Sequence, residues 1–259
     1  MEIIVFVKQV PATESIIEIA EDGRGIQTEG LKWVMNPYDE LAVEEAIRIR
    51  EAQGGTVTIL SVGPEKAKET IRVGLAMGAD KGVLISDPAA LATDGLGTAR
   101  VLAAAAKNLS FDLILAGQRA VDDDNYLAGP AAAELLDIPH IALAIKVEVA
   151  DGRVRCQRTV EGGTMTVTAP LPALLTTQRG LNEPRYASLP GIMKAKKKPI
   201  EELSLADLGL DADALAPQMT VVGMSHPPER GGGRMIEGES PAEVAETLVR
   251  HLHEEAKVI

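Results

Sequence analysis

The sequence predicts an α/β protein with an open, mostly parallel sheet and helices on both of its faces. Short apolar runs with strand character alternate with longer segments in which apolar residues recur at helical spacing. The composition suits a globular chain, because 46% of the 259 residues are hydrophobic and 25% are charged. From about residue 141 the pattern changes to alternating residues separated by glycine bends, which predicts antiparallel hairpins added to the parallel sheet.

Strands and helices are predicted in strict alternation over the first half of the chain. Strand-like runs lie at 3–7, 57–62, 82–85 and 113–116, and helical segments lie at about 38–53, 65–77 and 96–108. Glycines follow the first two helices, and Pro64 suits the first turn of the second. This alternation is typical of a parallel sheet whose connections are helical.

The predicted hairpins occupy the segments 145–149, 154–160 and 165–168, with bends at Asp151-Gly152 and Gly162-Gly163. A buried strand resumes at 171–177. Farther on, a stretch rich in proline and glycine predicts an irregular arm, and Ser240 with Glu243 predicts a capped helix at its end. Such an arm typically wraps another surface.

The composition argues against nucleic acid as a partner and against a segment that spans a membrane. The formal charge of −12, from 38 acidic and 26 basic residues, repels a phosphate backbone. Six aromatic residues are too few for a base-stacking surface. No apolar stretch approaches the ~20 residues that span a bilayer, so we expect a chain that is not embedded in a membrane.

Metal sites, catalytic centres and disulfides are also not expected. The single cysteine, Cys156, cannot form an internal disulfide and cannot alone supply a zinc site. The sequence contains neither a P-loop nor GxGxxG after its first strand, and its four histidines form no HExxH pattern. We therefore predict no catalytic residue and, because the N-terminus has no secretory pattern, a cytoplasmic location.

The segment from Ala116 to Leu136 is the first candidate site. A strand ends there, a glycine turn follows, and a helix is predicted to start near Asp124 or Asn125, so backbone N–H groups should converge at the carboxyl edge of the sheet. This geometry favours a phosphate site. The alternative is that the three aspartates 122–124 only cap a solvated turn. Beside a phosphate they would have to point away, accept N–H groups, or pair with a base such as Arg119.

Met35-Asn36-Pro37-Tyr38-Asp39-Glu40 is the second candidate site. Pro37 holds Asn36 extended, so Asn36 can present its amide to a flat ring before the helix begins. The alternative is a simple helix cap. Both candidate segments lie at the edge where open parallel sheets bind nucleotides, which favours a shared nucleotide site.

The segment 179–198 is a candidate docking loop. It presents apolar side chains among prolines and lysines, which is typical of a protein-docking anchor with a charged rim. The alternative is a solvated surface loop. Taken together, these features predict an α/β nucleotide-binding domain over residues 1–199, including the docking loop 181–198, and a C-terminal arm and helix over residues 200–259.

The chain resembles the β subunit of electron-transfer flavoproteins over essentially its whole length. The segments that carry the resemblance are VKQVP at 7–11, MNPY at 35–38 with AVEEA at 42–46, AMGAD at 76–80, the loop at 120–129, and LNEPRYA at 181–187 continued by IMKAKK at 192–197. The resemblance also passes through Arg158, the EGG at 161–163 and the PALLT at 172–176. It implies a Rossmann-like fold of the adenine-nucleotide α-hydrolase type.

The resemblance implies a heterodimeric electron carrier without catalytic turnover of its own. In that family the β subunit binds a structural AMP, and it shares with a larger α subunit an FAD that is held mainly by α. The complex takes electrons from acyl-CoA dehydrogenases of fatty acid oxidation and passes them to a membrane quinone oxidoreductase. The expected partners are therefore the α subunit, these dehydrogenases and the quinone oxidoreductase, and the arm is expected to wrap the α subunit.

The resemblance also implies which residues act. The nucleotide-binding residues are expected to be Phe6, Asn36, Pro37, Tyr38, Asp39, Val62, Ala120, Val121, Asp122, Asp123, Asp124, Asn125, Tyr126, Leu127, Ala128, Gly129, Pro130 and Ala131. The docking residues are expected to be Arg185, Tyr186, Leu189, Ile192, Met193, Lys194 and Lys197. Leu189 matches the anchor of the partner-recognition loop, and Lys194 and Lys197 match lysines that are methylated in some relatives.

Three places depart from the family pattern. Cys156 replaces a small aliphatic residue, Met165 replaces Glu or Gln, and residues 125–130 read NYLAGP where AMP-binding members often have Gln or Thr. Two alternatives therefore stay open. One is an electron-bifurcating flavoprotein subunit with a second FAD in place of AMP, and the other is a stand-alone nucleotide-binding regulator of the universal-stress type.

Overall fold

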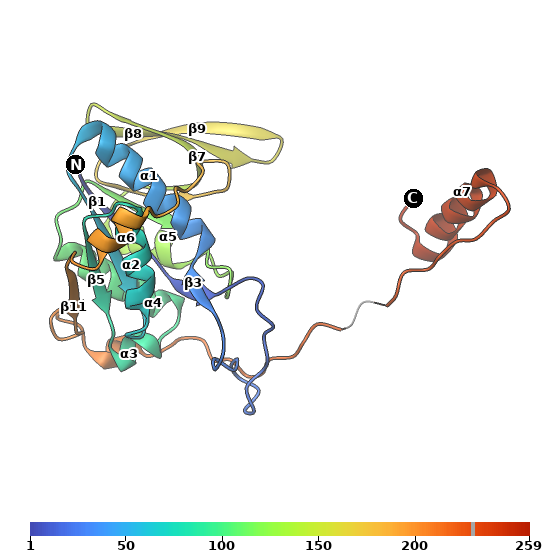
Figure 1. The fold of residues 1–259 in the computed structure, drawn as a ribbon, viewed down its shortest axis with the longest axis horizontal. Coiled ribbons are helices and arrows are strands. Elements are labelled where there is room, and N and C mark those ends of the chain that lie inside the picture. The colour runs from blue at the N-terminus through green and yellow to red at the C-terminus, as the bar shows by residue number, and fades with distance from the viewer. Residues whose placement is uncertain (229–230) are drawn as a thin grey trace.

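The computed structural model describes residues 1–228 and 231–259, and its body is built on one nine-stranded sheet (Figure 1). In order across the sheet the strands are β11 (Ile200–Leu203), β5 (Lys81–Ile85), β4 (Thr56–Val62), β1 (Glu2–Phe6), β6 (Leu113–Gly117), β10 (Ala173–Thr177), β7 (His140–Ala150), β8 (Arg153–Val160) and β9 (Gly163–Pro170). Neighbours from β11 to β7 pair in parallel, whereas β7–β8 and β8–β9 are antiparallel. The predicted fold class is confirmed.

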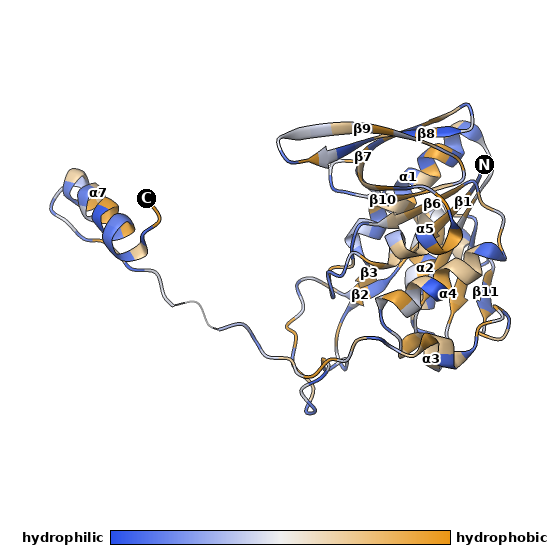
Figure 2. Cartoon of the chain, turned by 180° about the vertical axis from the view of Figure 1, so that it is seen from behind, coloured by the Kyte–Doolittle hydropathy of each residue, from blue (hydrophilic) through white to orange (hydrophobic). Residues whose placement is uncertain are grey.

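Helices cover both faces of the sheet. On one face lie α1 (Pro37–Gln53) and α2 (Ala67–Met77), and on the other lie α3 (Pro88–Leu91), α4 (Gly95–Lys107) and α5 (Ala128–Leu136). The strands divide accordingly, because Ile3 and Val5 of β1 face the first layer while Ile4 and Phe6 face the second. Both faces are thus buried, as is usual for parallel sheets, and Figure 2 shows the apolar strands between the helices.

The order of the chain reverses between β1 and β6. The connections from β1 through α1 to β4 and through α2 to β5 run on one face, and α4 and α5, before and after β6, lie on the other. Two connections that leave in opposite directions open a crevice at the carboxyl ends of β1 and β6. The sequence of elements therefore fixes where a ligand would enter.

The antiparallel hairpins β7–β8 and β8–β9 extend the sheet, and their turns at residues 151–152 and 161–162 lie at the predicted bends Asp151-Gly152 and Gly162-Gly163. Its outer strand β9 is an edge, and most of its residues are exposed. The helix α3 was not predicted, and neither was a separate antiparallel pair formed by β2 (Gln9–Pro11) and β3 (Trp33–Met35).

Residues 200–215 differ from the prediction of an irregular arm. Residues 200–203 form β11 at the edge of the parallel sheet, and a 3-10 helix, η1 (Ala212–Leu215), follows. Leu205 and Leu215 are buried in the core layer of α4. These residues therefore add an edge strand and two buried leucines to the body.

The helix α7 (Pro241–Arg250) lies apart from the body in Figure 1 and continues into a π-type turn, η2 (His251–Ala256). Its predicted cap is confirmed, because the Ser240 hydroxyl accepts a hydrogen bond from the N–H of Glu243 at 3.3 Å. None of the α7 residues is buried. Across the described residues, no helix combines the length and the apolar character needed to cross a membrane.

Candidate nucleotide site

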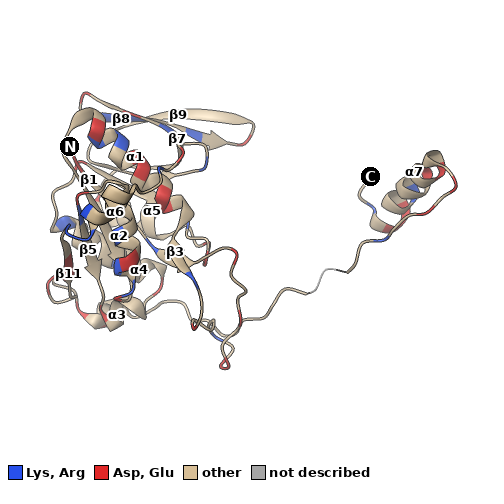
Figure 3. Ribbon diagram, viewed as in Figure 1, with Lys and Arg blue, Asp and Glu red and all other residues tan. Residues whose placement is uncertain are grey.

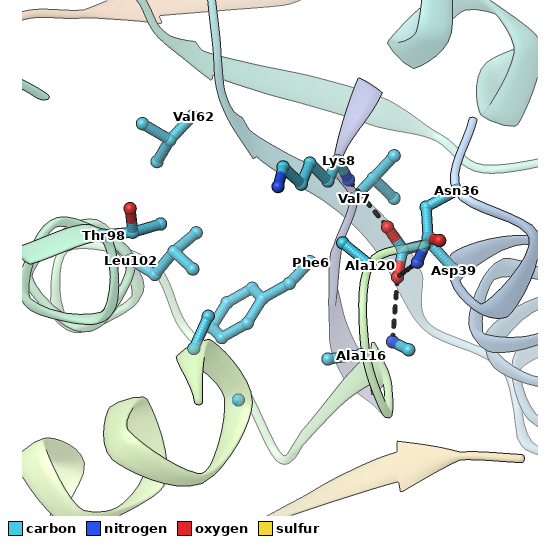
Figure 4. Close-up of a pocket in the computed structure, with 13 residues that line it drawn as sticks. Phe6, Val7, Lys8, Asn36, Asp39, Val62, Thr98, Leu102, Ala116 and Ala120 are labelled. Carbon is cyan, nitrogen blue, oxygen red and sulfur yellow. Dashed lines mark hydrogen bonds between the residues drawn. The ribbon is translucent and has the colours of Figure 1, made fainter. Parts of the chain in front are cut away.

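A pocket opens at the crevice between the carboxyl ends of β1 and β6 (Figure 4). Val62, Thr98 and Leu102 lie on one side of it, Asn36 and Asp39 lie on the other, and Phe6 and Lys8 stand between them. The remaining lining residues are Val7, Ala116, Gly117, Ala120, Ala128 and Gly129. One wall is thus apolar and the other polar, and the small residues let a ligand approach the backbone closely.

Asn36 and Asp39 tie three chain segments together at the polar wall. The Asp39 carboxylate accepts hydrogen bonds from the N–H of Lys8 at 2.7 Å, the N–H of Gly117 at 3.0 Å and the Asn36 amide at 2.9 Å. The same Asn36 amide donates to the carbonyl of Arg119 at 2.8 Å, and its oxygen accepts from the N–H of Val121 at 3.2 Å. These bonds hold the ends of β1 and β6 against the start of α1.

Burial changes the proton affinity of this network. Asp39 is 5% exposed, and its burial raises the pKa to about 7, although the three N–H donors oppose that shift. Gly117 is required beside it, because a Cβ at that position would lie 2.3 Å from an Asp39 carboxylate oxygen and 2.9 Å from the Tyr38 backbone. The carboxylate is therefore enclosed by backbone rather than by solvent.

Each of the three aspartates of the loop is paired with a base, although Asp122 and Asp123 share one. The Lys8 ammonium donates to Asp122 at 2.9 Å and to Asp123 at 3.1 Å, and Arg119 donates to Asp124 at 2.6 Å. Burial alone would lower the pKa of Lys8, but Asp122 and Asp123 raise it above its usual value, so the ammonium stays charged. Pairing with a base such as Arg119 was one option predicted for these aspartates, and Arg119 pairs with Asp124. None of the three aspartates lines the pocket.

Arg119 also stacks with aromatic rings beside the loop. Its guanidinium carbon lies 5.1 Å from the centroid of the Tyr38 ring and 5.7 Å from that of Tyr126, and it donates to the Tyr38 hydroxyl at 3.1 Å. Asp124 and Tyr126 have positive φ angles of 50° and 56°. The stack and the ion pair hold this strained part of the loop in place.

The predicted helix start near Asp124 or Asn125 is wrong, because α5 begins at Ala128. The positive φ angles at Asp124 and Tyr126 prevent a helix there, and the Asn125 side chain instead accepts from the N–H of Leu127 at 3.0 Å. The first-turn residues Ala128 and Gly129 line the pocket. Their N–H groups occupy helix positions that have no intrahelical acceptor, so they can bind an anion.

The structure brings together seven of the expected nucleotide residues in the lining of the pocket. They are Phe6, Asn36, Asp39, Val62, Ala120, Ala128 and Gly129. The others, Pro37, Tyr38, Val121, Asp122, Asp123, Asp124, Asn125, Tyr126, Leu127, Pro130 and Ala131, lie in the flanking loop and helix starts. Sequence reasoning missed Lys8, Thr98 and Leu102. The position of Lys8 directly after the first strand was the available signal for it.

The expected docking segment contains a short helix, α6 (Leu189–Ala195), which was predicted as a loop. Ser188 caps it, since its hydroxyl accepts from the N–H of Gly191 at 3.1 Å. Tyr186 is 99% exposed and Leu189 79% exposed, and Met193 and Ile192 are also exposed. Arg185 differs from these, because its guanidinium binds glutamates of α1.

Comparison with known proteins finds a matching family model and relatives that align with the whole chain. A family model described as "Electron transfer flavoprotein domain" matches residues 24–208. A relative from Bacillus subtilis, "Electron transfer flavoprotein subunit beta", is 46% identical, and the match covers 100% of each chain. Relatives with the same name from Bradyrhizobium diazoefficiens and Homo sapiens are 42% and 40% identical, covering 100% of this chain and 100% and 99% of theirs.

The chain belongs to the electron transfer flavoprotein β-subunit family. This confirms the resemblance and removes the alternative of a universal-stress-type regulator. The matched residues 24–208 of this family member run from before β3 to beyond β11, so they include the polar wall, the loop and α6. Over residues 1–228 and 231–259, no group of three metal-binding side chains is close enough to hold an ion.

Proposed function

We propose that the pocket between β1 and β6 binds AMP as a structural nucleotide. The observation that carries the proposal is the pocket itself, which has one apolar wall, one amide and carboxylate wall, and the start of α5 at its mouth. This chemistry suits the three parts of AMP. Phe6 and Leu102 would pack on the base, the Asn36 amide oxygen would accept a hydrogen bond from the base or sugar, and the first-turn N–H groups of Ala128 and Gly129 would bind the phosphate.

The ion pairs around the loop would keep this site ready for an anion. Asp122 and Asp123 would repel a phosphate if they were free, but each is bound by Lys8. Lys8 is the only cation among the thirteen lining residues. Its single positive charge therefore offsets part of the negative charge of the two aspartates beside the expected phosphate position.

The protein would act as the β subunit of a heterodimer with an electron-transfer flavoprotein α subunit. The relatives' name, subunit beta, supports a larger assembly. The FAD, held mainly by the α subunit, would supply the redox chemistry by accepting electrons and passing them on. The arm and α7 would wrap the α subunit, which is supported by exposed apolar residues such as Met219, Val222 and Met235.

Electrons would come from acyl-CoA dehydrogenases and leave to a membrane quinone oxidoreductase. The exposed side chains of Tyr186, Leu189, Ile192 and Met193, with Lys194 and Lys197 at the rim, would form the docking surface for a dehydrogenase. The protein would carry electrons without a catalytic turnover of its own. A cytoplasmic location is part of the proposal and is supported by the single cysteine, Cys156, which is buried and free.

The nucleotide content of the purified heterodimer tests the proposal. Acid release and chromatography should yield AMP and FAD in about equal amounts, since one pocket and one shared flavin site are proposed. Two FAD and no AMP would contradict AMP binding and favour the bifurcating alternative. A chain that purifies with neither nucleotide when the α subunit is present would contradict both.

A further inference from the structure

Residues 182–185 lie along one polar stripe of α1. The Asn182 amide donates to the carbonyl of Leu41 at 3.1 Å and to the Glu45 carboxylate at 2.9 Å. Arg48 donates to the carbonyl of Glu183 at 3.2 Å. Positions 41, 45 and 48 recur at helical spacing, so the stripe runs along one face of α1 and holds the chain immediately before the docking residues.

Arg185 completes this attachment as a two-carboxylate clamp, defined here as Arg185 with Glu44 and Glu51. Its Nε donates to Glu44 at 2.8 Å, and its two terminal nitrogens donate to the two oxygens of Glu51 at 2.6 and 3.0 Å. The side chain of Glu44 is only 2% exposed and also accepts from Arg48 at 2.6 Å. Paired, planar contacts of this kind fix direction as well as distance.

The charges of the clamp persist at neutral pH. Burial alone would raise the pKa of Glu44, but the hydrogen bonds from Arg185 and Arg48 outweigh it and hold the pKa below its usual value. The hydrogen bond from Arg185 likewise lowers the pKa of Glu51. Both carboxylates are therefore ionised under ordinary conditions.

The other end of the segment is fixed to α2 by two reciprocal caps. Arg72 of α2 donates to the carbonyls of Ala195 and Lys198 at 2.5 and 2.6 Å, which caps the end of α6. Lys198 donates to the carbonyls of Leu75 and Ala79 at 3.1 and 2.5 Å, which caps the end of α2. Lys198 therefore has a different role from the neighbouring lysines of the basic run.

We propose that Glu44 and Glu51 are positioning residues that hold the docking segment in its binding conformation before a partner arrives. Exposed apolar side chains such as Tyr186 and Leu189 have no core of their own to fix them, so the polar attachments at both ends set their direction. Presenting an anchor in advance lowers the ordering cost of association. The inference rests on the proposed docking function and adds to it that the partner meets a preformed surface.

The test uses the complete heterodimer and a dehydrogenase reduced by its acyl-CoA. Glu51→Gln removes one arm of the clamp at a half-exposed position. We expect KM for the dehydrogenase to rise roughly three- to tenfold with kcat unchanged, and hydrogen exchange of residues 186–195 to become faster. Glu202→Gln is the matched control, because Glu202 is similarly exposed and pairs with Lys68 at 2.7 Å away from the segment.

A double-variant cycle decides whether the clamp acts through the anchor. Leu189→Ala should raise KM by itself, and adding Glu51→Gln to Leu189→Ala should then raise it little further. Two results would overturn the positioning role alone. One is a fully additive rise of KM in the double variant, and the other is an unchanged KM in Glu51→Gln when Leu189→Ala raises KM as expected. An unchanged KM in Leu189→Ala would show that this segment is not the docking surface, and it would overturn both the proposed docking function and the positioning role. Glu44→Gln serves as a second variant, for which a larger effect in the same direction is expected.

Discussion

Asp39 and Lys8 set the character of the pocket at the scale of single residues. Asp39 joins the ends of two strands that are far apart in the sequence, and Lys8 reaches Asp122 and Asp123 across more than a hundred residues. The sequence marked Asn36 and Asp39 because a proline between them fixes a helix start. For Lys8 the available signal, its position directly after the first strand, was weak, since a lysine there is ordinary until its distant partners are brought beside it.

The raised pKa of Asp39 predicts that the free energy of unfolding depends on pH. The pKa is about 7 in the folded chain and about 3.9 in an unfolded one, so the folded state binds the proton more tightly between these values. The free energy of unfolding should therefore fall as the pH rises from about 4 to about 7, by at most about 1.4 kcal/mol per pH unit, and level off above. Asp39→Asn should lack this contribution. Denaturant titrations of both proteins measure it, and parallel pH curves would contradict the assignment.

Lys8→Gln should weaken AMP binding while leaving the flavin content unchanged. Without the ammonium, Asp122 and Asp123 become free to repel the phosphate, and a loss of about tenfold in affinity is expected for one charge-assisted contact. Titration calorimetry with AMP added to the nucleotide-depleted heterodimer measures the change. Lys32→Gln is the control, since Lys32 forms an exposed pair with Glu14. Equal affinities in the two variants would exclude Lys8 from the site.

At the scale of elements, the hydrophobic pattern predicted the strands correctly where both faces of the sheet are buried. The runs that became β1, β5 and β6 are mostly apolar, β4 adds Thr58 and Ser61 to such a run, and the helix predicted at about 38–53 is α1, which buries Leu41, Ala42 and Ile47. The strand β11 was missed because it is short and half acidic, with Glu201 and Glu202 in its centre. Because β11 pairs on only one side and its central residues are exposed, its sequence lacks the apolar run that identifies a buried strand.

The close packing of α6 on α2 depends on Gly191. A Cβ at this position would lie 2.5 Å from the carbonyl oxygen of Ala76, which belongs to the backbone and cannot rotate away. Gly191→Ala should therefore push α6 off α2, lower the unfolding free energy by about 1–3 kcal/mol, and speed hydrogen exchange in residues 187–198. Gly25→Ala, where a Cβ would meet open space, is the control. Unchanged exchange would show that α6 can shift without loss.

At the scale of the whole molecule, a compact body carries an extended C-terminal segment. Figure 3 shows acidic and basic residues along the ribbon of both parts. The sequence indicated an arm from its proline and glycine content, but it could not show that residues 200–215 return to the sheet. That return depends on contacts of Leu205 and Leu215 with the distant α4 layer.

Removing residues 225–259 should separate folding from assembly. The body keeps all nine strands and the contacts of Gln218 and Met219 with Asp94, so its unfolding temperature should shift by less than about 3 °C. The same chain, mixed with the α subunit, should form little flavin-containing heterodimer. Calorimetry and absorbance of the purified complex measure the two effects. A full-length chain that is yellow without the α subunit would contradict the shared flavin site.

The two edges of the sheet differ in a way that bears on how copies of the chain associate. On one edge, β11 carries Glu201 and Glu202, and such charges discourage pairing with another strand. On the other, β9 reads GTMTVTAP, an uncharged and largely exposed strand. An open edge of this kind is a template for aggregation. At high concentration, copies of this chain are therefore expected to associate edge to edge through β9.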